Sequence, residues 1–137
     1  MSKSVLNTAR QILSIEARAI RGLLREVGRD FERALELLAG CQGRVIVTGM
    51  GKPGFIARKI AATLASTGTP SLFLHPAEAV HGDLGMVTEK DVMMALSQSG
   101  ETEEIVRLIS SVKKSAFRSL PLQATRPPVW QNMRMWF

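Results

Sequence analysis

The sequence has little of what marks secreted or membrane proteins. Its single cysteine, Cys41, excludes a disulfide bond within the chain and suits a reducing compartment. No apolar run approaches the roughly 20 residues that a membrane-spanning helix needs, and no charged-then-apolar leader opens the chain. We therefore expect a cytoplasmic protein that has no membrane partner.

The positive charge is too unevenly spread to indicate a nucleic-acid surface. Half of the formal net charge of +6 comes from the last 22 residues, which hold three arginines and no acidic residue. The preceding part has 15 basic and 12 acidic residues. Four arginines (Arg18, Arg21, Arg25 and Arg29) form a stripe on a predicted helix, but no aromatic residues interleave with them. This balance favours small anions as ligands and excludes nucleic acid as an expected partner.

The order of predicted elements indicates an α/β fold. A chain of 137 residues suffices for one domain with a core. Strands that alternate with helices, joined by short glycine turns, predict a three-layer, doubly wound parallel sheet. In chain order we expect N-terminal helices in 1–43, strands at 44–48, 71–74 and 91–96, helices at 55–65 and 103–114, and a long irregular segment at 75–87.

A hydroxyl-rich turn stands between the third strand and the last helix. The sequence Ser97-Gln98-Ser99-Gly100-Glu101-Thr102 follows an apolar strand and precedes a helical pattern. The free N–H groups and the dipole of a helix N-terminus attract anions, and hydroxyl groups add donors there. The turn therefore predicts a phosphate site, although an ordinary turn in which Thr102 caps the helix explains the same residues.

The first strand is followed by a second glycine turn, Gly49-Met50-Gly51-Lys52-Pro53-Gly54. Its spacing fits a dinucleotide fingerprint, but His75 stands where that fingerprint expects an acidic residue, at the end of the next strand. A nucleotide-binding oxidoreductase is thereby disfavoured. Lys52 lies where open α/β sheets bind ligands, so it is a candidate functional cation as well as a possible surface lysine.

Together these motifs resemble the sugar isomerase (SIS) domain family, which binds phosphosugars. The turns at 49–54 and 97–102 carry the resemblance, with Ala65-Ser66-Thr67-Gly68-Thr69-Pro70 and the segment from His75 to Met86. The segments 49–52, 65–70 and 75–86 resemble one branch of the family, the arabinose 5-phosphate isomerases. The match extends from the N-terminal helix to Lys114 and covers only the first part of such an enzyme.

The resemblance implies roles for individual residues. It implies phosphate binding by Ser97, Ser99, Thr102, Ser66 and Thr67, with Gly49, Gly51 and Gly100 shaping the loops. Glu104 would be the general acid or base, Lys52 would steady negative charge, and His81 would orient the sugar. The family usually has Ser where this chain has Pro53. N-terminal helices of this family help to pack subunits, which implies a homo-oligomer.

No metal or cofactor is expected. The spacing of His75, Glu78, His81 and Asp83 fits no standard zinc pattern. A non-catalytic phosphosugar-binding regulatory module is the alternative to an isomerase, although the N-terminal helices lack a recognisable helix-turn-helix.

The last segment, 115–137, departs from the pattern. It shows neither strand alternation nor a β-branched run, and Pro127-Pro128 interrupts any element. A shifted reading frame or an artificial junction explains such an end, and a docking tail is the alternative. We expect this segment to be disordered, to leave the edge of the sheet open, and the chain to lack isomerase activity by itself, because the family's remaining catalytic groups lie later in its domain.

Overall fold

The computed structural model describes residues 3–114 and 134–136. The elements follow the expected α/β order, with an additional short strand at the end of the chain. They are α1 (Lys3–Gly22), η1 (Leu23–Arg25), α2 (Arg29–Ala39), β1 (Val45–Gly49), α3 (Lys52–Ser66), β2 (Ser71–Leu74), α4 (Pro76–Val80), η2 (Asp83–Met86), β3 (Val92–Ser97), α5 (Glu103–Lys114) and β4 (Arg134–Trp136).

The sheet has the order β2-β1-β3-β4, and β1 pairs in parallel with both of its neighbours. The β-branched run Val45-Ile46-Val47 is fully buried in this central strand, as expected for a strand covered on both faces. The predicted parallel α/β sheet is confirmed.

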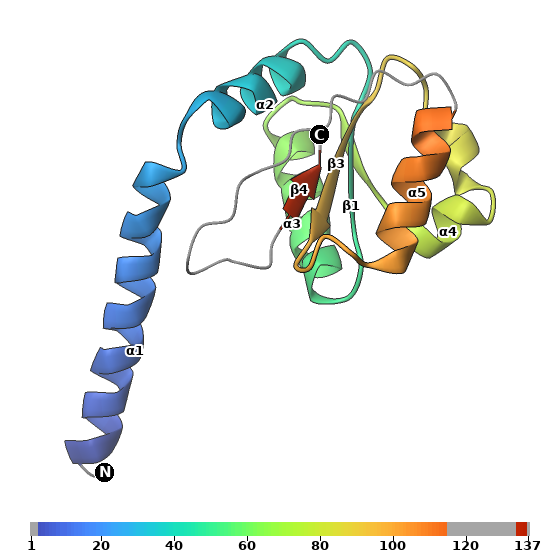
Figure 1. Ribbon diagram of the computed structural model, residues 1–137. Helices are drawn as coiled ribbons and strands as arrows, with labels where there is room; N and C mark the ends of the chain where they lie inside the picture. The colour runs from blue at the N-terminus through green and yellow to red at the C-terminus, as the bar shows by residue number, and fades with distance from the viewer. Residues whose placement is uncertain (1–2, 115–133, 137) are drawn as a thin grey trace.

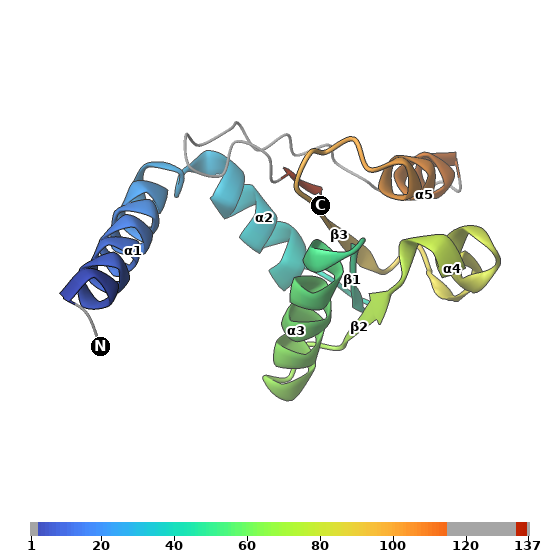
Figure 2. The same ribbon diagram turned by 90° about the horizontal axis from the view of Figure 1, so that it is seen from below.

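Helices cover both faces of the sheet, which gives three layers (Figures 1 and 2). On one face, Val45 and Val47 pack with Ala57 and Ala61 of α3, and Leu38 of α2 lies against this cluster. On the other face, a second cluster joins the sheet to α4 and α5 through Ile46, Leu74, Ala79, Leu108 and Val112. Alternate residues of the same strand thus build two separate cores.

Helix α1 extends away from these layers (Figures 1 and 2). Its apolar residues Leu6, Leu13 and Ile20 recur every seven positions and are 52%, 64% and 67% exposed. An isolated helix of this length is marginal in water, because most helical stability in proteins comes from packing of an apolar face. No other described element covers the apolar face of α1.

The expectation of a long irregular segment at 75–87 is wrong. The structure has helix α4 and the 3-10 helix η2 there. Pro76 occupies the first turn of α4, where its fixed backbone angle favours a helix and its missing N–H costs nothing. Buried Pro76 and Ala79 hold this short helix on the sheet.

The end of the chain also differs from expectation. Strand β4 pairs antiparallel with β3, so that Ala95 lies opposite Trp136 and Ser97 opposite Arg134. The edge of β3 is therefore covered at these positions, since a short antiparallel pairing needs backbone groups and no crossover helix. The rest of the expected disordered tail, 115–133 and Phe137, lies outside the described residues.

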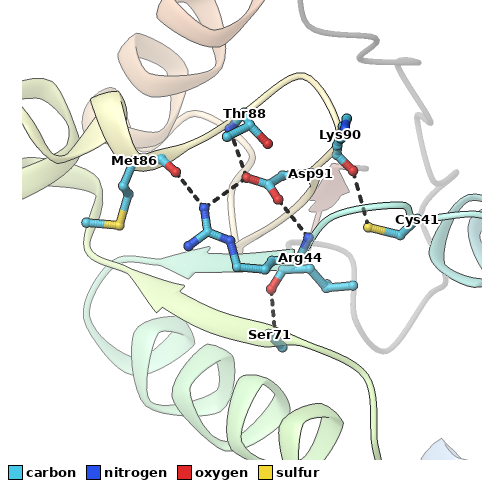
Figure 3. A network of polar contacts seen from close by, with 8 residues as sticks. Cys41, Arg44, Ser71, Met86, Thr88, Lys90 and Asp91 are labelled. Carbon is cyan, nitrogen blue, oxygen red and sulfur yellow. Dashed lines mark hydrogen bonds and ion pairs between the residues drawn. The ribbon is translucent and has the colours of Figure 1, made fainter.

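A buried carboxylate ties β1 to β3 at the amino end of the sheet (Figure 3). Asp91 Oδ1 accepts the Arg44 backbone N–H at 2.6 Å, and Oδ2 accepts the Thr88 N–H at 2.8 Å and pairs with Arg44 Nη2 at 3.2 Å. Burial alone would raise the pKa of Asp91. These hydrogen bonds and the guanidinium charge instead hold that pKa below its ordinary value of 3.8.

This pKa predicts an acid-sensitive contribution to stability. Because the folded-state pKa is depressed, the contribution is complete above the unfolded value of 3.8 and is lost as the pH falls through the lower folded value. We expect Asp91→Asn to lower the free energy of unfolding by about 1–3 kcal/mol at pH 7. The difference from the unaltered chain should shrink at pH 3, as measured by urea denaturation.

Asp30→Asn is the matched control, since its pair with Arg33 is exposed and contributes little. An equal loss in both variants would contradict the role assigned to Asp91.

Candidate functional site

Two loops meet at the carboxyl end of the sheet. Gly49, the last residue of β1, lies opposite Leu96, and β3 ends at the following residue, Ser97. The β1–α3 loop and the β3–α5 turn are therefore neighbours, at the lower end of the sheet in Figure 1. Helices α3 and α5 leave toward opposite faces. This switch point, between β1 and β3, is where open α/β sheets bind ligands.

The β3–α5 turn is organised by its own hydroxyl groups. Ser97 is buried, its Oγ accepts the Gly100 N–H at 3.0 Å, and it lies 2.9 Å from Thr102 Oγ1. Ser99 Oγ accepts the Glu101 N–H at 3.1 Å and is exposed. Gly100 has a φ of 73°, a left-handed conformation that favours glycine. Three of the predicted phosphate ligands, Ser97, Ser99 and Thr102, are thus brought together.

The turn leads directly into the N-terminus of α5. The Thr102 carbonyl accepts the Val106 N–H at 3.0 Å, so Thr102 is the N-cap residue through its backbone. Its hydroxyl bonds to Ser97 and not to a helix N–H, which removes the simple side-chain cap as the explanation of this threonine. The N–H groups of the first turn of α5 have no partner within the helix and favour an anion.

The β1–α3 loop carries Lys52 at the same end of the sheet as this turn. Gly51 has a φ of 62°, and Lys52 follows it as the exposed first residue of α3. Gly49 and Gly54 approach closely, since a Cβ on Gly54 would lie 2.7 Å from the Gly49 carbonyl oxygen. A cation at a helix N-terminus opposes the helix dipole. Helix stability therefore does not explain why a lysine occupies this position.

The three glutamates near the turn have different surroundings. Glu103 forms an exposed ion pair with Arg107, with Oε1 and Nη2 2.6 Å apart, so its carboxylate is directed along the helix surface. Glu101 is exposed, whereas Glu104, one residue farther into α5 than Glu103, is half-buried. Glu104 is thus the least exposed of the three glutamates.

The histidines follow β2 at the same end of the sheet. His75 is the N-cap residue of α4 and contacts Phe73 edge-on, with 6.3 Å between ring centroids. His81 is the exposed C-cap residue of α4, which leads away from the carboxyl end of β2. Among the described residues, no hydrogen bond joins His81 to Lys52 or to the β3–α5 turn.

Ser66 and Thr67 are not part of this cluster. They end α3, which starts at the carboxyl end of the sheet and runs about 22 Å, at 1.5 Å per residue, to the amino end. Both hydroxyls donate to the Thr63 carbonyl at 2.9 Å and satisfy the end of their own helix. The structure therefore does not bring Ser66 and Thr67 to the β3–α5 turn, and their support of the phosphate site stays a prediction.

Within residues 3–114 and 134–136, no group of His, Cys, Asp and Glu side chains has the arrangement of a metal site. In the same part of the chain, no helix is both long enough and apolar enough to cross a membrane.

Comparisons with known proteins give this site a family context. The SIS domain family matches residues 37–122. The chain is 54% identical over 109 residues to arabinose 5-phosphate isomerase KdsD of Pseudomonas aeruginosa, covering 80% of the chain and 33% of the relative. It is 46% identical over 122 residues to arabinose 5-phosphate isomerase GutQ of Escherichia coli K12, a match that covers 89% of this chain and 38% of the relative. The chain thus spans about a third of the length of these curated relatives.

Solved structures agree with the sequence comparisons. A protein of Escherichia coli CFT073, solved in complex with arabinose 5-phosphate, superposes with a TM-score of 0.71 at 42% identity, over 85% of this chain and 63% of that one. A sugar-phosphate isomerase from Listeria monocytogenes superposes with a TM-score of 0.78 at 31% identity, over 85% of this chain and 62% of that one. The family match covers more than half of the chain, and the solved structures share its fold. This protein therefore belongs to the SIS domain family.

Proposed function

We propose that the chain binds a phosphorylated sugar and forms the first part of an arabinose 5-phosphate isomerase, which interconverts arabinose 5-phosphate and ribulose 5-phosphate. The β3–α5 turn is the observation that carries this proposal, because it gathers three hydroxyl groups at the N-terminus of a helix. Relatives that are arabinose 5-phosphate isomerases support the choice of sugar. Such an enzyme acts in the cytoplasm and needs no metal or cofactor for its proton transfers.

The phosphate binds at α5 in this proposal, and not at α3. In the first turn of α3, Pro53 has no N–H, and the Gly54 N–H already donates to the Gly51 carbonyl at 3.0 Å. The first turn of α5 keeps its N–H donors and is flanked by Ser99 and Thr102. The phosphate therefore lies against α5, and the reacting end of the sugar extends toward Lys52.

The reaction needs a base that takes the proton from carbon 2 and returns it to carbon 1, and a positive group that stabilises the enediolate oxygen. Glu104 carries the proton between the two carbons. Lys52 stabilises the developing negative charge from the neighbouring loop, and His81 orients the sugar hydroxyls. Glu103 takes no part, because Arg107 holds its carboxylate.

Ser99 provides a direct test of the phosphate site. A hydrogen bond to a charged group contributes about 1.5–3 kcal/mol. We therefore expect Ser99→Ala to weaken arabinose 5-phosphate binding at least severalfold by calorimetry, and unphosphorylated arabinose not to bind measurably. Ser110→Ala, on the exposed surface of α5, is the control and should bind as the unaltered chain does. Equal affinity of the two variants would refute the site.

Glu104→Gln tests the chemistry in a version extended with the C-terminal part of a longer relative. The substitution keeps the shape and removes the base, so kcat should fall by about 10²–10⁴-fold while KM changes little. Glu103→Gln is the matched control on the same helical turn and should leave kcat nearly unchanged. A loss of less than about tenfold in Glu104→Gln would make this glutamate structural.

A non-catalytic phosphosugar-binding module is the second candidate for the chain as given. The observation in its favour is that the hydroxyl groups of the phosphate turn lie within these residues, whereas no hydrogen bond among the described residues joins His81 to that turn. Arabinose 5-phosphate that binds to the extended version without turnover would favour this candidate.

We propose that the isomerase assembles into a homo-oligomer through the exposed face of α1. Its leucines and isoleucine form a stripe that no other described element covers, and a second copy offers the same stripe. Burial of apolar residues of this size stabilises an interface by about 1.5–3 kcal/mol each.

Leu13→Glu places a charge in the middle of this stripe. We expect this variant to sediment as a smaller species than the unaltered protein in analytical ultracentrifugation, because burial of an unpaired carboxylate opposes association. Gln11→Glu lies about 200° around the same helix and should leave the oligomer intact. An unchanged sedimentation coefficient for Leu13→Glu would contradict assembly through α1.

A further inference from the structure

The side chain of Arg44 holds two separate points of the segment between α4 and β3 (Figure 3). One guanidinium nitrogen, Nη2, donates to the Met86 carbonyl at 2.5 Å and pairs with Asp91 Oδ2 at 3.2 Å. Met86 is the last residue of η2, and Asp91 directly precedes β3. Arg44 itself precedes β1, the central strand, so this contact fixes the segment to the most buried part of the sheet.

Asp91 holds the side chain of Arg44 in one place. Its side chain is 2% exposed, and both of its oxygens are occupied by donors. The Lys90 carbonyl on the same loop accepts the Gly43 N–H at 2.8 Å and the Cys41 thiol at 3.6 Å. A Cβ on Gly43 would meet Asp91 Oδ1, so the two chain segments are also in close contact. A buried, fully bonded carboxylate of this kind leaves its arginine little freedom.

The turn that carries His81 lies between this anchor and α4. On one side, the His81 N–H donates to the Glu78 carbonyl at 3.0 Å, and the buried Ala79 holds α4. On the other side, η2 is closed by the Gly85 N–H on the Gly82 carbonyl at 3.0 Å, and it ends at the carbonyl that Arg44 binds. His81, Gly82 and Asp83 are exposed between the two ends.

We propose that Arg44 is a positioning residue for His81: it fixes η2 to β1 and thereby sets where the His81 side chain stands. The inference rests on the proposed function, in which His81 orients the sugar. Arg44 lies at the amino end of the sheet, opposite the candidate site, so it touches no substrate and acts only through the backbone of 82–86.

Arg44→Lys tests this role. The backbone N–H still donates to Asp91 and the positive charge remains, but the lysine side chain is shorter, so its ammonium group does not reach the point from which Nη2 bonds to Met86 and Asp91. The first measurement is hydrogen exchange of the backbone amides of Gly85 and Val87, which should become about fivefold faster. The amides of Gly100 and Glu101 should not change. Arg33→Lys, in an exposed pair on α2, is the control.

The second measurement is calorimetric binding of two probes, arabinose 5-phosphate and inorganic phosphate. Arg44→Lys should weaken binding of the sugar phosphate about fivefold to tenfold and leave inorganic phosphate unchanged, since phosphate needs only the β3–α5 turn. His81→Ala in the Arg44→Lys background should cause no further loss, because both changes remove the same contribution.

Each outcome decides the proposal. Unchanged exchange at Gly85 and Val87, an equal loss for both probes, or additive effects of the two substitutions would overturn the positioning role. If the unaltered chain binds no arabinose 5-phosphate, the proposed function fails, and the exchange of Gly85 and Val87 still decides whether Arg44 fixes the turn.

Discussion

The parallel pairing of β1 with β3 is the constraint on which the candidate site depends. It brings the ends of two strands together, and the helices that follow them leave toward opposite faces. Two positive helix ends thus converge on one place, with hydroxyls from one loop and an ammonium group from the other. A slip of one residue in this register would turn Ser97 to the other face of the sheet and separate it from Thr102.

The two ends of the sheet satisfy their polar groups differently. At the amino end, Asp91 and Arg44 bond to each other and to the neighbouring backbone. At the carboxyl end lie the two buried side-chain atoms that have no hydrogen-bond partner among the described residues, Thr48 Oγ1 and His75 Nδ1. Each such atom costs about 1–3 kcal/mol. The buried polar groups are thus hydrogen-bonded at the end where the fold anchors its loops. At the end where the ligand is proposed to bind, two of them lack a partner among the described residues.

Much of this fold could be predicted from local patterns, because strands and helices with one buried face have a regular spacing of apolar residues. Helix α5 has the predicted bounds, and its turn gathers the predicted Ser97 and Thr102. The order of elements also says at which end of the sheet a residue lies: Ser66 ends α3 and precedes β2, so it lies at the amino end, away from the β3–α5 turn. Local patterns do not reveal contacts between distant residues: Arg44 and Asp91 are 47 positions apart, and neither stands in a motif.

Lys52 connects stability with binding. At the first position of α3 it faces the positive end of the helix dipole, which disfavours a cation by about 0.3–1 kcal/mol. A sugar phosphate or enediolate at the proposed site would offset this repulsion, because its negative charge attracts both the lysine and the helix ends. The loop is therefore less stable without a ligand than with one, and a ligand that binds only the folded chain raises its stability in proportion to its affinity. The ammonium group of Lys52 thus destabilises the loop without a ligand and favours the binding of an anion.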